Sequence, residues 1–329
     1  MKTFCSILAV SIYLIILFVP ASAVGQQVCT LPSMMLDQRP DHNGAPTKVS
    51  IGVYIADITD VDDVAQALTG DFIVLQQWYD ERLANLAGCK FSTAAVWNPE
   101  LELLNSSLLT QMRPLQRDQI SVESGGFVSH YQRYFGSLST YHHLKRFPFD
   151  DQAFKLRVSS AHYDLDELVL SVNTDMTRIS ELINIPDWTI KEVKADIDTR
   201  DAFGLGNIQS MYVLEIQAER DSNFYIWKIL VPLTLIVMMS WVVFWINPVK
   251  FGSQLGISAT SMLTLIAFQF AQTGVLPKLS YFTIMDKLIL GSSVLVFFSF
   301  FESALAICLV AEGREEDAFK LDKVCRWLF

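Results

Sequence analysis

Charged residues are scarce in this 329-residue sequence: they make up 18% of it, while hydrophobic residues make up 51%. That balance is too apolar for an ordinary soluble domain and predicts segments that enter a membrane. The sequence also lacks a Walker loop, a dinucleotide-binding glycine fingerprint, a nucleophile elbow and an H-E-x-x-H pair. We therefore expect no enzyme, no cofactor and no confident metal site.

Cysteine is scarce as well, with five residues in the whole chain. So low a number excludes a small domain that depends on a disulfide scaffold. Cys29 and Cys89 both lie in the part that is expected to be exported. A disulfide between them is possible there, although no motif supports the pairing.

The N-terminus has the parts of a secretory signal. Lys2 supplies the positive charge, the apolar run ILAVSIYLIILFV follows, and residues 21–23 (ASA) form a small-residue cleavage site. We predict a signal peptide over residues 1–23. The alternative is an N-terminal anchor helix, which the short apolar run disfavours.

Acidic residues concentrate in the first part of the chain. Residues 24–225 contain 28 acidic and 16 basic residues, whereas residues 226–329 contain 7 acidic and 8 basic residues. This charge argues against nucleic acid as a partner. It favours cations near the exported part.

Residues 24–225 are predicted to form an extracellular or periplasmic domain. Seven short segments between residues 49 and 220 are rich in β-branched and aromatic residues, and several alternate by twos. Turn-forming residues separate them. The pattern predicts an all-β, immunoglobulin-like sandwich, with a short helix near residues 60–67.

Residues 226–329 are predicted to form an α-helical transmembrane bundle. Three apolar runs, residues 226–246, 252–273 and 288–310, are long enough to cross a bilayer. Pro232 lies inside the first, which a membrane helix tolerates when neighbours satisfy the freed carbonyl. Residues 320–329 resemble the start of a fourth helix, so we expect the sequence to be truncated.

The loops predict the orientation of the three spans. An exported N-terminal domain places the NPVK turn inside the cell, the LPKLSY turn outside and the C-terminal segment inside. Lys250 and the basic residues of the C-terminal segment agree with positive charge on the cytoplasmic side, although neighbouring acids weaken the signal.

The second span carries a stripe of residues spaced alternately by four and three positions. These residues are Gly256, Thr260, Leu263, Ala267, Phe270 and Gly274. The spacing places them on one helix face. In a ring of identical helices, that face would surround water and its apolar part would gate by dewetting. The alternative is close packing between helices, for which small and hydroxyl residues are also common.

Four motifs carry a resemblance to a known family. They are WYDERL at residues 78–83, WNPELELLN at residues 97–105, FPFDDQ at residues 147–152 and LPKLSYFTIMD at residues 276–286. Together with the order of sandwich and spans, they resemble the pentameric ligand-gated ion channels, the Cys-loop receptor superfamily. The resemblance extends over about residues 49–329.

The resemblance implies a homopentamer in a lipid bilayer, with the second span lining the pore. It implies an agonist site between neighbouring sandwiches, for an amine, an aromatic acid or protons. Candidate agonist contacts are Trp97, Ser159, His162, Tyr163, Phe203, Tyr212 and, on the opposite face, Phe72. Aromatic boxes of this kind suit cations and apolar ligands.

The resemblance also implies a gating interface between the base of the sandwich and the helices. Its candidate residues are Phe147, Pro148, Phe149, Asp150, Arg220, Pro277, Lys278, Leu279 and Tyr281. Arg220 is expected to pair with Asp150 or Asp151. The physical requirement is a stiff contact that has two alternative packings.

One departure from the family pattern is clear. Thr140 and Phe154 stand where cysteines should flank the signature loop. Bacterial members lack that disulfide, so the resemblance is to the prokaryotic branch and implies the bacterial inner membrane. The acidic domain favours monovalent cations as the permeant ions.

Two further acidic features have open interpretations. Glu302 inside the third span is either functional, as intramembrane acids commonly are, or a group near the interface that faces another helix. Residues 57–63 (DITDVDD) form either a Ca²⁺ site or, as we favour, a solvated acidic loop. The competing functions for the whole chain are a membrane-anchored binding or adhesion protein without a pore, and a membrane enzyme that uses Glu302 as an acid.

Overall fold

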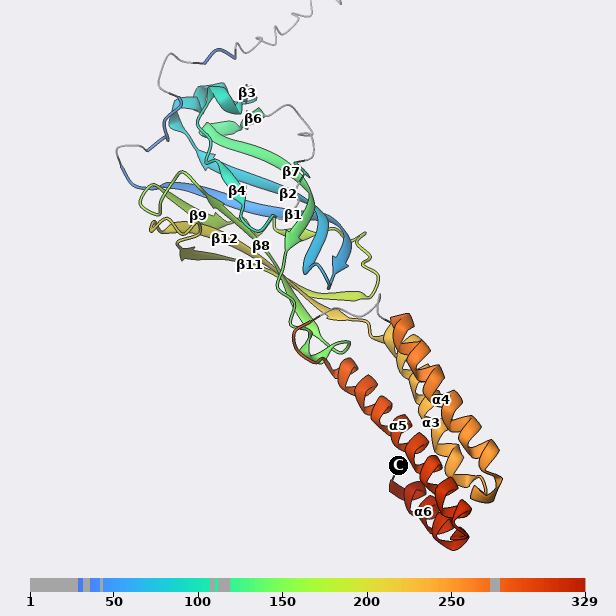
Figure 1. Cartoon of the computed structure of the whole chain (residues 1–329). Coiled ribbons are helices and arrows are strands. Elements are labelled where there is room, and N and C mark those ends of the chain that lie inside the picture. The colour runs from blue at the N-terminus through green and yellow to red at the C-terminus, as the bar shows by residue number, and fades with distance from the viewer. Residues whose placement is uncertain are drawn as a thin grey trace, which may run out of the picture.

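The computed structural model describes residues 29–31, 36–41, 44–106, 110–111, 119–272 and 279–328. Within these ranges a β-sandwich is joined end to end with a rod of helices (Figure 1). The predicted signal peptide over residues 1–23 lies outside the described residues. So do the stripe residue Gly274 and the linker residues Pro277 and Lys278.

The sandwich consists of two sheets. The larger has the order β10-β1-β2-β7-β6-β3, with β9 also on β1 and β5 also on β7, and the smaller has the order β11-β12-β8-β4. The strands of the larger sheet are β1 (Thr47–Asp62), β2 (Ala67–Tyr79), β3 (Lys90–Ser92), β5 (Thr110–Gln111), β6 (Gln119–Val122), β7 (Phe127–Ser139), β9 (Leu168–Val172) and β10 (Arg178–Ile179). The smaller sheet contains β4 (Leu101–Leu103), β8 (Asp151–Ser160), β11 (Trp188–Arg200) and β12 (Gln209–Arg220).

Alternation of side chains explains why the long strands form the two sheets. In β1 the residues Val49, Ile51, Val53 and Ile55 are buried and share one face, as the period of two requires. Their counterparts on the facing sheet include Leu156 and Leu214, and together they form one continuous core. The predicted sandwich is therefore confirmed, and all seven predicted strands are present.

The short helix predicted near residues 60–67 is wrong. β1 continues to Asp62 and β2 begins at Ala67, so residues 63–66 form the turn of a hairpin. The Asp62 carboxylate accepts hydrogen bonds from the backbone N–H groups of Val64 and Ala65, both at 2.8 Å. In this Asx-type turn the Asp62 side chain binds the backbone N–H groups, so the segment does not need helical hydrogen bonds. The acidic composition of the segment did not reveal this turn.

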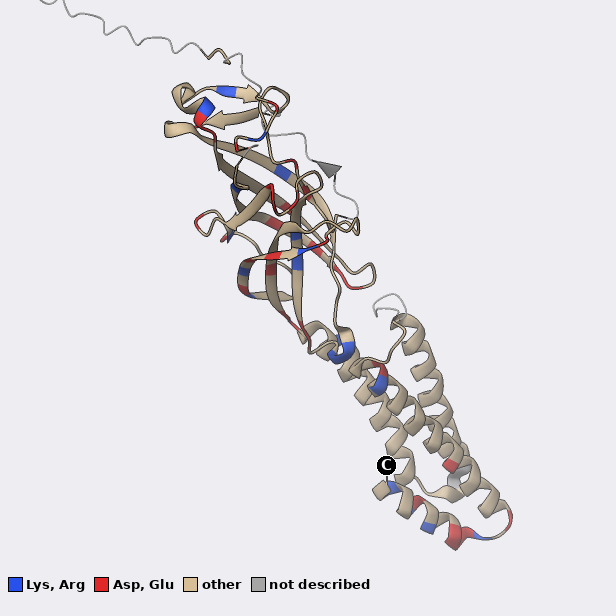
Figure 2. Ribbon diagram, turned by 90° about the vertical axis from the view of Figure 1, so that its left-hand side faces the viewer, with Lys and Arg blue, Asp and Glu red and all other residues tan. Residues whose placement is uncertain are grey.

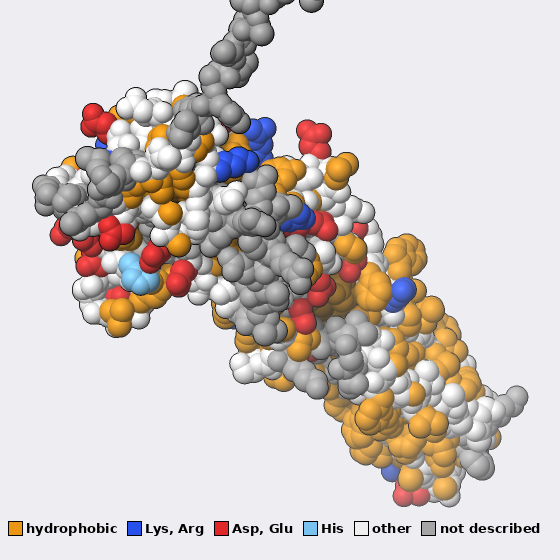
Figure 3. Space-filling model, turned by 90° about the horizontal axis from the view of Figure 1, so that it is seen from above, with side chains coloured by type: hydrophobic (Ala, Val, Ile, Leu, Met, Phe, Trp, Pro, Cys, Tyr) orange, Lys and Arg blue, Asp and Glu red, His pale blue; other side chains and the backbone are white. Residues whose placement is uncertain are grey.

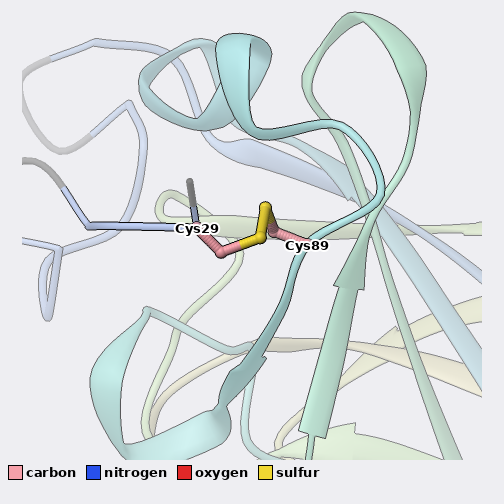
Figure 4. Close-up of a disulfide and its surroundings, with 2 residues drawn as sticks. All are labelled: Cys29 and Cys89. Carbon is pink, nitrogen blue, oxygen red and sulfur yellow. A yellow bond between two sulfur atoms is a disulfide. The ribbon is translucent and has the colours of Figure 1, made fainter. Parts of the chain in front are cut away.

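Cys29 and Cys89 form a disulfide, 60 residues apart in sequence (Figure 4). It ties the start of the described chain to the segment just before β3. The resemblance described above places the signature cysteines at positions 140 and 154, so the Cys29–Cys89 bond is not the signature pair. Cys308 and Cys325 are free thiols.

Three described helical segments are long and apolar enough to cross a membrane: Asn223–Trp245, Gly252–Gln272 and Ile284–Ala311. The first runs through α2 (Asn223–Tyr225), a π-helical turn (Ile226–Leu230), α3 (Val231–Val242) and a 3₁₀ turn (Val243–Trp245). Pro232 is the second residue of α3, two positions after the π turn ends. Proline has no N–H to donate and its ring clashes with the carbonyl of the preceding helical turn. The wider π turn before Pro232 relieves that clash.

The remaining helices complete the rod. A 3₁₀ turn (Pro248–Lys250) leads into α4 (Phe251–Gln272), and α5 (Ile284–Ala311) follows. A fourth helix, α6 (Glu315–Leu328), packs against α5 at the end of the rod farthest from the sandwich (Figure 1). It begins at Glu315, five residues before the predicted start at 320.

The surface differs between the two halves. Lys, Arg, Asp and Glu gather on the sandwich and near the two ends of the helical rod (Figure 2). Hydrophobic side chains cover much of the visible surface of the rod (Figure 3). Leu235, Trp241, Phe297 and Phe301 are large hydrophobic residues of the helices that are exposed in the single subunit, as suits contact with lipid.

The helix α5 begins four residues before the predicted boundary at residue 288. The Thr283 side chain accepts a hydrogen bond from the Asp286 N–H at 3.1 Å, and the Asp286 carboxylate accepts one from the Thr283 N–H at 2.9 Å. This capping box satisfies two backbone donors at the helix start. Polar Asp286 therefore belongs to the first turn of the helix.

We expect Thr283→Ala to destabilise the chain by about 1 kcal/mol, because the cap hydrogen bond is lost. Thermal unfolding in detergent measures the change. Thr283→Ser is the matched control, since it keeps the hydroxyl acceptor, and it should unfold close to the unmodified chain. Equal loss in both variants would show that the methyl group, not the cap, stabilises this helix start.

Candidate functional site

Arg220 is the last residue of β12, at the base of the sandwich. Its side chain is only 2% exposed. Nε donates to Asp150 Oδ1 at 2.9 Å and Nη1 donates to Asp63 Oδ2 at 2.7 Å, while Nη2 reaches Asp63 Oδ1 at 2.9 Å and Asp150 Oδ2 at 3.2 Å. One guanidinium thus joins the loop before β8 to the β1–β2 hairpin.

The electrostatics of this triad favour its charged form. Burial alone would lower the pKa of Arg220, but hydrogen bonds with Asp63 and Asp150 outweigh it, and the pKa lies above its ordinary value. Burial would also raise the pKa of Asp63. Hydrogen bonds from His142 and Arg220 reverse that effect and hold the pKa of Asp63 below its ordinary range.

Buried His142 extends the triad into the signature loop. Its Nδ1 lies 3.1 Å from Asp63 Oδ1, and its Nε2 lies 2.8 Å from the Thr140 hydroxyl. The Phe154 ring packs edge-on against the imidazole, with 5.3 Å between ring centroids. Thr140 and Phe154 thus contact the same histidine.

Phe147 lies between the triad and the helices. The Arg220 guanidinium lies 4.9 Å from its ring centroid, and the Tyr225 ring lies 4.8 Å away at an interplanar angle of 75°. Its carbonyl accepts a hydrogen bond from the Met285 N–H in the first turn of α5 at 3.3 Å. The loop therefore contacts the starts of both the first and the third helical segments.

A small apolar cluster surrounds these contacts. Its buried members are Leu144, Phe147, Tyr225, Ile229 and Met285, and the predicted interface residue Leu279 packs against them. Predicted Tyr281 also takes part, because its hydroxyl accepts a hydrogen bond from the Leu144 N–H at 3.2 Å. Pro148 is buried and Phe149 exposed.

Sequence reasoning missed several residues of this interface, namely Leu144, Tyr225, Ile229 and Met285 of the cluster and Asp63 and His142 beside Arg220. It offered Asp150 or Asp151 as the partner of Arg220; Asp150 is the partner, while Asp151 points outward. Asp63 contributes the second carboxylate. The sequence signal for Asp63 is the DITDVDD run, which ends in the β1–β2 hairpin turn. Its acidic composition alone favours a solvated loop and does not single out Asp63.

The helix α4 presents two different polar faces. One face is buried within the subunit: Ser258 bonds to Ser303 of α5 at 2.7 Å, and the Gln269 amide donates to the Ser293 hydroxyl at 2.6 Å. Gln254 also lies on this face. Part of the polar character of the span therefore serves packing against its own subunit.

The predicted stripe occupies the other face of α4. Gly256, Thr260, Leu263, Ala267 and Phe270 are all exposed in the single subunit, and Leu263 and Phe270 reach 69% and 73%. Large apolar side chains thus stand away from the packed face of their own subunit. The arrangement suits either a pore or contact with neighbouring copies.

The candidate agonist loops lie at one end of the sandwich. The Leu165 N–H donates to the Ile208 carbonyl at 2.8 Å, which joins the loop after β8 to the tip of the β11–β12 hairpin. Trp97 is buried and its indole N–H donates to the Tyr163 hydroxyl at 2.9 Å. Half-buried Tyr163 and Phe203 and exposed His162 border this region.

Three of the candidate agonist residues lie in the sandwich instead. Phe72 and Tyr212 belong to the hydrophobic core. The buried Ser159 hydroxyl donates to the Ser210 carbonyl at 3.0 Å. Burial raises the pKa of Tyr212 to about 12. In the single subunit the side chains of these three residues are turned inward by strand alternation, as is that of Trp97, so ligand contact at these positions stays a prediction.

The described residues contain no group of three or more His, Cys, Asp or Glu side chains arranged to hold a metal ion. In the DITDVDD segment, Asp62 instead caps the hairpin turn and Asp63 pairs with Arg220. Asp57 and Asp60 lie on β1.

Comparison with known proteins gives matches in both halves. Residues 34–220 match the neurotransmitter-gated ion-channel ligand binding domain, and residues 229–329 match the neurotransmitter-gated ion-channel transmembrane region. The chain is 26% identical over 276 residues to gamma-aminobutyric acid receptor subunit beta-4 of Gallus gallus, which covers 81% of this chain and 56% of the relative.

Two further relatives are similar. The theta subunit of the Mus musculus receptor is 25% identical over 272 residues, covering 80% of this chain and 42% of the relative. The beta subunit of the Lymnaea stagnalis receptor is 25% identical over 286 residues, covering 81% and 57%. The chain spans about half the length of the curated relatives it matches.

Proposed function

Because this chain belongs to the neurotransmitter-gated ion-channel family, we propose that it forms a homopentameric channel whose pore is lined by α4. Proteins of this family are ion channels rather than enzymes. A small agonist binds between neighbouring sandwiches and shifts the equilibrium between a closed and an open pore. The exposed stripe on α4 is the observation that carries this proposal.

The stripe supports a pore because the same helix has already satisfied its packing on the other side. Buried Ser258 and Leu265 face the subunit, while Thr260 and Leu263 face away. In a ring of five copies, Leu263, Ala267 and Phe270 make apolar rings that exclude water when they are narrow. Thr260 makes a polar ring nearer the cytoplasmic end.

The triad and the Phe147 cluster support coupling from the sandwich to this helix. Agonist binding at the sandwich reaches the membrane through the two loops that Arg220 holds together. The cluster includes half-buried Phe268 of α4 itself. A change in packing at the cluster therefore directly alters the contacts of the proposed pore helix.

The agonist site is proposed where the loop after β8 meets the β11–β12 hairpin. Tyr163, His162 and Phe203 are its accessible candidates, with Trp97 supporting Tyr163 from beneath. Aromatic faces and the nearby Glu100 suit an amine, and the His162–Glu100 pair at 2.9 Å also makes protons a candidate agonist. An aromatic acid is the third class to be screened.

Monovalent cations are the proposed permeant ions, because acidic residues outnumber basic ones in the extracellular domain and concentrate cations near its mouth. Reversal potentials under a salt gradient test this choice. A reversal potential that follows the anion gradient would overturn the selectivity and leave the channel itself intact. The proposed location is a plasma membrane, and Thr140 with Phe154 in place of cysteines favours a bacterial one.

Cysteine accessibility tests the pore. In a chain whose free Cys308 and Cys325 are replaced by serine, we expect Leu263→Cys to react with a charged thiol reagent in water and to lose its current. The reaction should exceed that of Leu265→Cys by about tenfold or more, because thiol reactivity follows exposure to water. Leu265 lies on the buried face of the same helix.

The opposite outcome has a definite meaning. A Leu263→Cys protein that stays unmodified in every state, with no ion flux in vesicles, would favour helix packing over a pore. The chain would then be a membrane-anchored extracellular binding protein. Equal reaction at both positions would show that α4 does not keep the packing described here.

A further inference from the structure

Two carboxyl groups are buried together at the cytoplasmic end of the helical rod. Glu302 of α5 is 5% exposed and Asp322 of α6 is 3% exposed, and each carboxyl lies close enough to act on the charge of the other. The interface at the base of the sandwich lies at the other end of the rod (Figure 1). The proposed function gives this pair no role.

The pair has no cationic partner among the described residues. Neither carboxyl forms an ion pair, and both Glu302 oxygens are sealed from solvent without a hydrogen-bond donor. The nearest basic side chain, Arg326, donates instead to the Phe244 carbonyl at 2.8 Å and lies over the Trp245 ring. Two unneutralised carboxylates in one dry site would repel strongly.

A bound proton removes this repulsion between the two carboxylates. One protonated carboxyl donates to the other, ionised carboxyl, and this charge-assisted bond satisfies both groups. The apolar side chains around Glu302, among them Phe298, Phe301 and Leu305, line a cavity of about 370 Å³ and keep the site in a low-dielectric environment. The sealed oxygens leave no access for a larger cation.

We propose that Glu302 and Asp322 form a proton-binding site on the cytoplasmic side, which one shared proton occupies and which Gln254 links to α4. The Gln254 amide donates to both Asp322 oxygens at 3.3 Å. Gln254 lies two residues before Gly256, the first residue of the exposed stripe. One position beyond Glu302, Ser303 bonds to Ser258 of α4 at 2.7 Å.

The other titratable and charged groups near the pair are few. From α6, Arg326 acts on Asp322 through its charge, and burial together with the two acids raises the pKa of the Cys325 thiol. From α4 the facing group is the neutral Gln254 amide. Burial raises the pKa of Asp322, and hydrogen bonds from Glu302 and Gln254 partly offset that rise. Because the Gln254 amide already donates to both Asp322 oxygens, Asp322 is the acceptor in the pair and Glu302 is the group that holds the proton.

Loss of the proton to an alkaline cytoplasm would leave two negative charges in contact. Their repulsion separates α6 from α5 and withdraws the acceptor to which Gln254 is bonded. A folded state that holds a proton which the unfolded chain would release loses stability as pH rises. We therefore expect alkaline cytoplasmic solution to disfavour the packing of α4 described here.

Infrared difference spectroscopy on the full reconstituted chain tests for the proton directly and does not depend on channel activity. Between mildly acidic and alkaline buffer, the unmodified protein should lose the carbonyl band of a protonated carboxyl group. Glu302→Gln should abolish that band, while Glu316→Gln, on the exposed side of α6, should keep it. An unchanged band in Glu302→Gln would overturn the proposal.

The electrical test rests on the proposed channel function. In inside-out patches, a cytoplasmic pH step should change the open probability of the unmodified chain on the order of tenfold, a usual size for coupling between sites. Glu302→Gln, which imitates the protonated carboxyl, should lose the response. A protein that has the infrared band but no current would refute the channel function and leave the proton site standing; a full pH response in Glu302→Gln would refute the link to the pore.

Discussion

Replacing Arg220 with glutamine is expected to destabilise the chain by about 3–5 kcal/mol, because two carboxylates are then left buried without their cation. Asp150 and Asp63 receive all four hydrogen bonds of this guanidinium. We also expect agonist-evoked current to disappear, since the β1–β2 hairpin loses its connection to the signature loop. Thermal unfolding in detergent and current recordings measure the two effects.

Two variants show whether the triad is responsible. Arg200→Gln removes an arginine from the neighbouring strand β11, where it forms an exposed pair with Asp198, and should change stability by less than about 1 kcal/mol. Arg220→Lys keeps the charge but loses the planar fork, so an intermediate result is expected. If Arg220→Gln and Arg200→Gln unfold at the same temperature, the buried triad does not contribute to stability as described.

Phe147→Ala should cost about 3–5 kcal/mol, because the lost ring leaves a cavity in a fully buried cluster. The packing contacts that are lost lie at the interface between the sandwich and the helices. Hydrogen exchange should therefore increase most at the Met285 N–H, which donates to the Phe147 carbonyl. Unfolding measurements give the cost, and exchange measurements give its location.

The neighbouring Phe149 provides the matched control. It has the same side chain, two positions further along the same loop, but it is 41% exposed. Phe149→Ala should therefore have a much smaller effect on stability and on exchange at Met285. If both variants exchange alike at that amide, the contact between Phe147 and α5 does not transmit packing to the helix.

The strands and the membrane helices were predictable because their signals are local. Alternation in β1 and the length of the apolar runs can be read without knowing any distant contact. Family motifs then placed Phe147 and Arg220 at one interface. The start of α5 was missed because Asp286 looks polar, although its spacing from Thr283 is that of a capping box.

What the sequence did not reveal depends on pairings between distant segments. Asp63 joins Arg220 across 157 residues, and nothing local distinguishes it from the other acids of its run. Phe72 and Tyr212 are candidate agonist contacts from the sequence but lie in the core of the single subunit, because the direction of a strand side chain depends on register. The proximity of Glu302 and Asp322 depends on how α6 packs against α5, which the helix start predicted over residues 320–329 did not specify.

The hydroxyl groups on the outer face of α4 have a further consequence. Thr260 donates its proton to the Gly256 carbonyl and Thr264 donates to the Thr260 carbonyl, each at 2.7 Å. With those protons engaged along the helix, the oxygen lone pairs are what each threonine offers outward. Around a fivefold axis, the Thr260 oxygens would form a ring of partial negative charge that attracts a hydrated positive ion. This attraction needs no charged side chain, and residues 252–272 contain none.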